Sequence, residues 1–278
     1  MGKKLDKAVE VVLAGTTDPK KVMKQARVSV ATAYAAIREA ENKIEKARLS
    51  LQSIPKPKSN VLVISDTHVP FEHPKAIEHC LRTQERFKCD TVVHIGDLVD
   101  NHAASRFDNE LTAMNVVDEL EVTQKEVQRW VKAFPNVKIC LGNHDRIPVR
   151  QAKALGISPH FLKSFNELYN LPDTWEASMR HVIDDVIYEH GVGSGGMYGA
   201  KNTSLQYGKS FVQGHTHRFG GSFYHYRDDG SSMFGLNVGC LASDDQYNSN
   251  YAENYIGKTT LGCGVVIEGR EGHFIPLV

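Results

Sequence analysis

The chain has 278 residues, of which 41% are hydrophobic and 24% are charged, and its formal net charge is zero. This length and composition predict one substantial globular domain with room for a small partner domain. No stretch is apolar for long enough to span a bilayer, which argues against a membrane protein. The five cysteines are far apart and contain no C-x-x-C pair. They argue against a disulfide framework or a zinc ribbon, and for a reducing, cytoplasmic compartment.

Charge is distributed unevenly along the chain. Residues 1–58 contain 13 Lys plus Arg and 6 Asp plus Glu, whereas the remainder contains 20 and 27. The first segment therefore carries a charge of +7 and the rest carries −7. A basic head on an acidic body predicts two parts with separate roles.

The first 50 residues show the spacing of helices. Apolar residues recur at helical intervals over residues 5–13, which predicts an amphipathic helix, and Glu10 within this stretch argues against a signal peptide. Gly15 favours a break, and either Thr17 or Asp18 can cap a second helix that has Pro19 at its first position. A third helix, rich in alanine, glutamate, lysine and arginine, is expected from about residue 30 onward.

Three short helices with a tight break before the last resemble the helix-turn-helix family, and residues 28–34 resemble the start of its recognition helix. Arg27 is a departure, because the turn of that family usually carries glycine. The resemblance implies that residues 1–50 form a small domain that binds nucleic acid. The alternative is a helical bundle that serves only partner binding or oligomerisation.

A linker is expected at residues 51–59, where two prolines with lysines between them end any helix and stiffen the chain. Over residues 60–278, short β-branched runs alternate with helical segments, which is typical of an α/β domain with buried sheets. Helices are expected over Pro74–Phe87 and Leu111–Phe134. Strands are expected over Val61–Ile64, Thr91–Ile95, Val137–Leu141, Val186–Tyr188, Phe211–Val212, Phe234–Val238 and Gly264–Ile267.

Polar side chains follow five of these strands, at the point where each strand ends. Sites at strand ends are where open α/β sheets bind ligands. Carboxylates, one amide and neutral imidazoles suit a pair of divalent ions such as manganese, iron, zinc or nickel. The residues are Asp66 and His68, Asp97 and Asp100, Asn143 to Asp145, His190, and His215 with His217.

The spacing within two of these groups predicts how their side chains lie. Asp66 and His68, and likewise His215 and His217, stand at i and i+2. On extended backbone such pairs project to the same side, so both members can face one site. Glycines occur in the turns that follow these strands, at Gly96, Gly142 and Gly214. They allow the chain to turn sharply as it leaves a strand and allow other groups to approach its backbone closely.

The motifs, in this order, resemble the calcineurin-like metallophosphoesterase superfamily over about residues 60–220. They are Asp66-Thr67-His68, Gly96-Asp97-Leu98-Val99-Asp100, Gly142-Asn143-His144-Asp145, His190 and Gly214-His215-Thr216-His217. The resemblance implies an α/β fold, a four-layer αββα sandwich over residues 60–278, next to the small all-α N-terminal domain. It also implies an enzyme, a metal-dependent phosphoesterase.

The same resemblance implies a role for each motif residue. The first ion would be held by Asp66, His68 and His217, the second by Asn143, His190 and His215, and both by Asp97. Manganese is the first candidate, with iron, zinc or nickel as alternatives. A metal-activated hydroxide would attack phosphorus.

His144 is implied as the general acid that protonates the leaving oxygen, a contribution of about 10²–10⁴-fold. Asp100 or Asp145 would hold its ring, and the residues leave this choice open.

The choice of phosphate ester depends on departures from one branch of the family. Phosphoprotein phosphatases carry a phosphate-gripping arginine where Asn101 stands, and glutamate where Asp145 stands. These differences favour a phosphodiester of nucleic acid or nucleotides. The alternative is a phosphomonoesterase acting on a small metabolite or a phosphoprotein. Substrate phosphate could be bound by Arg106, Arg146 and Arg218, although each could also be an ordinary surface charge.

The glycine-rich segment Gly191–Gly199 follows His190 directly. It is expected to let substrate approach the backbone, or to form a mobile flap. The alternative is an ordinary surface loop.

Overall fold

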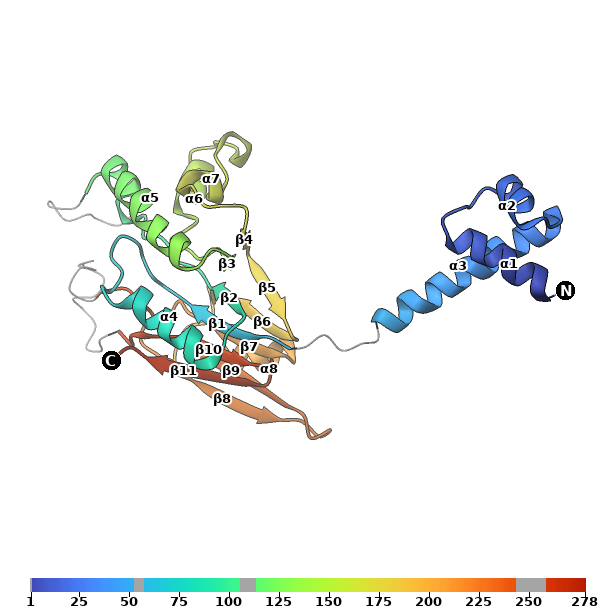
Figure 1. Cartoon of the computed structure of the whole chain (residues 1–278). Coiled ribbons are helices and arrows are strands. Elements are labelled where there is room, and N and C mark those ends of the chain that lie inside the picture. The colour runs from blue at the N-terminus through green and yellow to red at the C-terminus, as the bar shows by residue number, and fades with distance from the viewer. Residues whose placement is uncertain (1, 53–57, 106–113, 244–258) are drawn as a thin grey trace. The chain divides into compact units, whose positions relative to one another are not determined.

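The structure is a computed structural model that describes residues 2–52, 58–105, 114–243 and 259–278 (Figure 1). The chain divides into two compact units at residue 57, and each is considered separately. In the described residues, no helix is both long and apolar enough to cross a membrane.

The N-terminal unit is formed by three helices, α1 (Gly2–Leu13), α2 (Pro19–Ala26) and α3 (Val30–Gln52). They share a core of small and β-branched side chains, in which Ala8, Val22 and Ala36 are fully buried. The small all-α region expected from the sequence is therefore present.

The boundaries of α2 follow from local chemistry. Asp18 accepts a hydrogen bond from Lys20 N at 2.9 Å, which caps the first turn. Arg27 ends the helix in the left-handed region, with φ 54°, and its N–H donates to the Met23 carbonyl. Arg27 thus takes the conformation that glycine adopts most readily, at an energetic cost that a glycine would avoid.

The second unit contains two β-sheets. In the first, four parallel strands are followed by two antiparallel ones, so that the order is β4-β3-β2-β1-β10-β11. Its strands are β1 (Asn60–Ile64), β2 (Thr91–His94), β3 (Val137–Cys140), β4 (Trp175–Ser178), β10 (Gly262–Ile267) and β11 (Glu271–Pro276).

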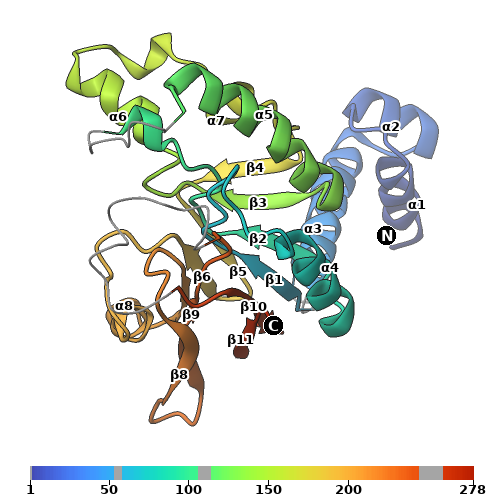
Figure 2. The same ribbon diagram turned by 90° about the vertical axis from the view of Figure 1, so that its left-hand side faces the viewer.

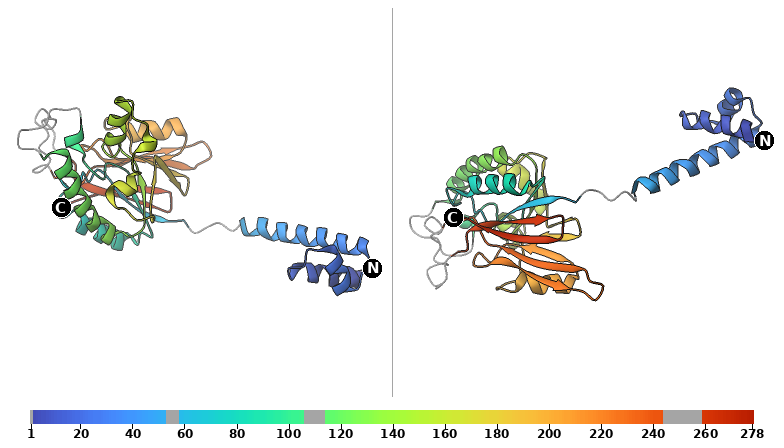
Figure 3. Two further views of the ribbon diagram at one scale, coloured as in Figure 1. Left: turned by 90° about the horizontal axis from the view of Figure 1, so that it is seen from above. Right: turned by 60° about the horizontal axis from the view of Figure 1, so that its bottom comes forward.

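The second sheet has the order β5-β6-β7-β9-β8, with β6, β7 and β9 parallel and an antiparallel strand at each edge. Figure 3 shows the two sheets stacked face to face. The strands are β5 (Arg180–Ile183), β6 (Val186–Glu189), β7 (Ser210–Gln213), β8 (Gly220–Tyr226) and β9 (Ser232–Val238).

Helices cover the two outer faces. The first sheet packs against α4 (Ala76–Phe87) and α5 (Val116–Ala133). The second packs against α8 (Gly199–Tyr207), which lies next to β9 (Figure 2). Two shorter helices, α6 (Ile147–Ala154) and α7 (Phe165–Tyr169), follow β3.

The core is divided between these layers by the alternation of side chains along each strand. In β1, Leu62 and Ile64 face the helices, whereas Val61 and Val63 face the second sheet, where Phe234 meets them. A third, smaller cluster lies between the second sheet and α8. These layers confirm the αββα sandwich expected from the sequence.

All seven expected strands are present, within two residues at each end. Of the two expected helices, the one over Pro74–Phe87 begins at Ala76. The one expected over Leu111–Phe134 begins at Val116, because the Asn115 side chain caps it. Residues 111–113 lie outside the described part of the chain.

Candidate metal centre

The candidate site lies where strands of both sheets end. The parallel strands β1, β2 and β3 of the first sheet and β6 and β7 of the second each deliver polar residues just past their last residue. The loops after β1 and β2 are joined, since Asp66 N donates to Gly96 O at 3.0 Å and His68 N donates to Asp97 O at 3.1 Å. Residues far apart in sequence therefore meet at one edge.

The backbone at this edge is left-handed, and the extended conformation expected for the two i, i+2 pairs is wrong. The angle φ is 49° at Asp66, 48° at His68, 65° at His215 and 46° at His217, and Asp97 has φ 50°. Such conformations are uncommon for residues other than glycine and cost of order 1–3 kcal/mol each. The pairs still converge, but through successive tight turns after a strand rather than through the pleat of a strand.

Two of the turn glycines permit the close approach expected of them. A Cβ on Gly142 would collide with the carboxylate of Asp97, and one on Gly214 would collide with the carboxylate of Asp66. Any larger residue at these positions would displace a candidate ligand.

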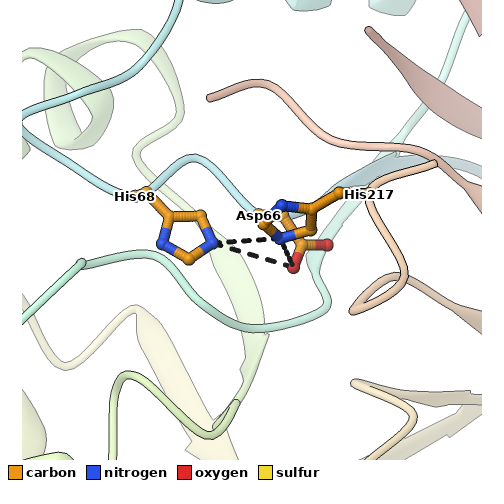
Figure 4. A group of neighbouring side chains, drawn as sticks. All are labelled: Asp66, His68 and His217. Carbon is orange, nitrogen blue, oxygen red and sulfur yellow. Dashed lines mark hydrogen bonds and ion pairs between the residues drawn. The ribbon is translucent and has the colours of Figure 1, made fainter. Parts of the chain in front are cut away.

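One group of candidate ligands consists of Asp66, His68 and His217. His217 Nε2 lies 3.0 Å from Asp66 Oδ1 and 3.2 Å from His68 Nε2, and His68 Nε2 lies 4.0 Å from the same oxygen. Figure 4 shows the nitrogens of both rings turned toward each other and toward the carboxylate. The second oxygen of Asp66 accepts from Ser65 Oγ and from His215 N, which fixes the carboxylate.

A second group consists of Asp97, His190 and His215, with Asn143 beside it. His190 Nε2 lies 3.1 Å from Asp97 Oδ2, 3.2 Å from His215 Nδ1 and 3.0 Å from Asn143 Oδ1. Four donors from four different loops thus surround one position.

Asp97 lies between the two groups. Its Oδ2 is 3.1 Å from His190 Nε2 on one side and 3.9 Å from His68 Nε2 on the other. Its Oδ1 accepts a hydrogen bond from His144 N at 2.8 Å, which fixes the carboxylate plane. A single oxygen is therefore within reach of both groups, as a shared ligand of two cations requires.

Two of the histidines are oriented by a partner on their outer nitrogen. His68 Nδ1 lies 2.8 Å from Asp100 Oδ1, and His190 Nδ1 lies 3.0 Å from the Ile95 carbonyl oxygen. Each acceptor holds the proton on Nδ1 and leaves Nε2 as a lone-pair donor toward the site.

The charges at the site favour cations. Asp66, Asp97 and Asp100 are buried, and among the described residues they form ion pairs only with histidines. Burial alone would raise the pKa values of these carboxyls, but the surrounding imidazoles hold each pKa below its usual value. Buried anions without a fixed cation are costly, so the residues fit divalent ions.

His144 faces Asp100. Its Nδ1 lies 2.6 Å from the Asp100 carbonyl oxygen and 3.3 Å from Oδ1 of the same residue. Burial disfavours the charged ring, but the Asp100 hydrogen bond and the nearby carboxylates raise the pKa of His144 to about 10. Asp100 therefore contacts two histidines, His68 and His144.

Asp145 has different partners. Its carboxylate accepts N–H groups from Asp97 and Gly142 at 2.8 Å each and from Val99 at 3.2 Å. It ties the loop after β2 to the loop after β3. Of the two carboxylates considered as holders of the His144 ring, Asp100 is the one within reach.

Asn101 occupies the position at which the phosphatase branch carries arginine. Its Nδ2 donates to the His144 carbonyl oxygen at 3.0 Å, and its Oδ1 accepts from Tyr169 Oη at 2.7 Å. The side chain thus supports the backbone of His144. Sequence reasoning did not identify Tyr169, which lies 68 residues away in α7.

The three candidate substrate arginines differ in position. Arg106 lies outside the described residues. Arg146 is the N-cap residue of α6, three residues after Asn143, and its Nη1 lies 3.9 Å from the sulfur of Met179. Arg218 is exposed directly after His217.

A buried network supports the loop after β1. Gly96 N donates to His94 Nδ1 at 3.3 Å, so the His94 proton resides on Nε2, 3.1 Å from Thr67 Oγ1, and Thr67 in turn donates to the Leu98 carbonyl. Burial lowers the pKa of His94 to about 3. His94 is thus a hydrogen-bonded core histidine, and its partner Thr67 stands between two candidate ligands, Asp66 and His68.

Comparisons with known proteins agree with this geometry. A family model described as calcineurin-like phosphoesterase matches residues 59–225 and includes all of the candidate ligands from Asp66 to His217. The Gene 54 protein of Mycobacterium phage L5 is 28% identical over 186 residues, which cover 58% of this chain and 69% of the phage protein.

Two solved structures align with about three quarters of this chain. Vacuolar Protein Sorting 29 from Cryptosporidium parvum is 13% identical, with a TM-score of 0.38, and the match covers 78% of this chain and 96% of that one. The phosphoesterase YfcE from E. coli is 16% identical, with a TM-score of 0.37, over 75% of this chain and 88% of its own.

Proposed function

Because the chain belongs to the calcineurin-like phosphoesterase family and is a metal-dependent phosphoesterase, we propose that it hydrolyses phosphodiester bonds of nucleic acid or nucleotides. The choice of a diester is supported by Asn101, whose amide is engaged by His144 and Tyr169. No arginine stands there to grip the extra charge of a monoester.

The proposed ligands divide into two sets that share one carboxylate. Asp97 is the shared ligand, since one of its oxygens lies within reach of both groups. When bound, the two ions supply Lewis acidity and an activated water. Manganese is the first candidate, and iron, zinc or nickel accept the same donors. One ion would be held by Asp66, His68 and His217, and the other by Asn143, His190 and His215.

The chain's own acid is His144. Its Nδ1 is held by Asp100, which leaves Nε2 free to donate a proton to the leaving oxygen. Asp145 supports the reaction indirectly. Its carboxylate accepts three backbone hydrogen bonds and so fixes the loops that carry Asp97 and His144. The arginines that flank the site, Arg146 and Arg218, together with Arg106, are proposed to meet the phosphate oxygens.

The proposal is tested by comparing matched ester substrates. With Mn²⁺, we expect a higher kcat/KM for bis-p-nitrophenyl phosphate than for p-nitrophenyl phosphate. The two substrates release the same leaving group, so the comparison isolates the preference for a diester over a monoester. We also expect the enzyme to hydrolyse a thymidine dinucleotide, which is a phosphodiester too. A preference for the monoester would favour the alternative, a phosphomonoesterase.

We also propose that the N-terminal unit binds nucleic acid. Three lysines of α2, Lys20, Lys21 and Lys24, are exposed, and Arg27 follows them in the turn. The start of α3 is exposed as well, with Tyr34 60% accessible. Exposed cations beside an accessible helix start suit contacts to phosphates and to a groove.

Replacing the three α2 lysines by glutamine in the full chain should weaken binding to duplex DNA and make it less sensitive to salt. Each lost phosphate contact makes the negative slope of log affinity against log salt shallower by about 0.9, so the loss of three contacts should make it shallower by about 3. Fluorescence anisotropy at several salt concentrations measures the slope. A control variant carries the same change at three exposed lysines of the other unit, Lys75, Lys153 and Lys163. An unchanged slope in the α2 variant would contradict this role.

A further inference from the structure

The loop between β6 and α8, residues 191–198, is anchored beside the candidate metal centre. It begins directly after His190. Two buried amides hold its backbone, because Gln213 Nε2 donates to the Ser194 carbonyl at 2.9 Å and Asn237 Nδ2 donates to the Met197 carbonyl at 3.0 Å. The sequence left three possibilities for this glycine-rich segment: a loop that lets substrate approach the backbone, a mobile flap, or an ordinary surface loop.

The anchors place the loop at the edge of the sheet that carries the candidate ligands. Gln213 and Asn237 are register partners at the ends of β7 and β9, and their side chains are hydrogen bonded at 3.1 Å. Gln213 stands two residues before His215. A side chain at Gly199 would collide with the Ser194 carbonyl, so the loop is also closely packed on itself. A segment held in this way is a preformed surface rather than a flap.

This fixed loop exposes apolar side chains to solvent. Val192 is 57% accessible, Met197 47% and Tyr198 52%. The Tyr198 ring packs against Phe223 of β8 at a centroid distance of 5.3 Å, and Lys201 Nζ lies 5.4 Å from its centroid. Met197 and Tyr198 are adjacent, so the anchored loop presents neighbouring apolar groups that a ligand can cover.

We propose that Tyr198 and Met197 form a stacking subsite for a nucleobase of the substrate, with Lys201 attracting an adjacent phosphate. This inference rests on the proposed function and names the part of the substrate that the subsite binds. A tyrosine face and a polarisable thioether both contact bases without regard to sequence. Because the loop is preformed, little ordering opposes binding.

The test measures binding of a nucleotide and of its base-free counterpart by isothermal titration calorimetry. For Tyr198→Ala in the full chain, affinity for thymidine 5′-monophosphate should fall about 5- to 150-fold, the range of one stacked base. Affinity for 2-deoxyribose 5-phosphate should not change. Tyr198→Phe retains the ring face and should bind like the parent. The matched control is Tyr226→Ala, since Tyr226 is 81% exposed on β8.

The outcomes separate this inference from the proposed function. Equal affinity of the parent for both ligands would overturn the subsite, as would an equal loss for both in Tyr198→Ala. Hydrolysis of methyl p-nitrophenyl phosphate, a diester without a base, should be the same in the control Tyr226→Ala and the parent. A parent that hydrolyses no diester but binds the nucleotide through Tyr198 would refute the proposed reaction and leave the subsite standing.

Discussion

Replacing Asp97 by asparagine should lower kcat for bis-p-nitrophenyl phosphate by about 10³-fold or more, the equivalent of several kcal/mol of charge stabilisation. The carboxylate oxygen that faces both His68 and His190 becomes part of a neutral amide. Asparagine can still accept the His144 N–H through its Oδ1, so the loop after β3 keeps its support. The change therefore removes charge at the shared position with little loss of shape.

Metal content distinguishes this effect from a general loss of folding. The purified variant should retain fewer ions per chain than the parent, for which two are expected, by mass spectrometry of the metals, while its circular dichroism spectrum is unchanged. Asp173→Asn is the matched control, because Asp173 is exposed in the same domain. Asp97→Asn protein with two bound ions and activity within about tenfold of the parent would contradict a bridging role.

The candidate ligands could be named from the sequence because each follows an apolar strand. Asp66 and His217 are 151 residues apart and yet meet at 3.0 Å. Strand ends at one edge of parallel sheets account for this convergence in general terms. The division of the ligands into two groups came only from the resemblance to a family, since strand order within each sheet is not visible in local patterns.

The backbone of the site could not be predicted. Asp and His carry no sign of a left-handed conformation, and the i, i+2 spacing of Asp66 and His68 is the spacing of a strand. Yet the chain turns sharply after a buried strand and still brings both side chains into one group of candidate ligands. The N–H groups of this loop donate to the carbonyl oxygens of Gly96 and Asp97, which belong to the loop after β2. These acceptors lie about 30 residues further along the chain, so no local stretch of sequence contains both partners.

Four strands were not predicted from the sequence, namely β4, β5, β8 and β11, and the reason differs from that for the backbone of the site. β4 and β5 have four residues each, and Trp175 is the one buried residue of the two strands. β8 begins with two glycines, and β11 contains a glycine and ends in proline. Apolar runs identify central strands, whereas edge strands such as β5, β8 and β11 depend on the pairing partner.

Removing the imidazole of His144 should affect one class of diester far more than another. An alkoxide leaves poorly without a proton, whereas p-nitrophenolate is stable as an anion. For His144→Ala we expect a fall in kcat of about 10²–10⁴-fold on a thymidine dinucleotide. The loss on bis-p-nitrophenyl phosphate should be much smaller. Both ions should remain bound, because the His144 ring is engaged by Asp100 and belongs to neither proposed ligand set.

The pH dependence gives the same role a second signature. Asp100 and the nearby carboxylates raise the pKa of His144 above the ordinary imidazole value, so the ring holds its proton at neutral pH. In the parent, kcat for the dinucleotide should decline as pH rises through this pKa, since the acid loses its proton. The decline should be absent in His144→Ala and present in His160→Ala, whose imidazole is exposed near α6. An alkaline decline that survives in His144→Ala, or an equal loss on both diesters, would assign the proton to another donor.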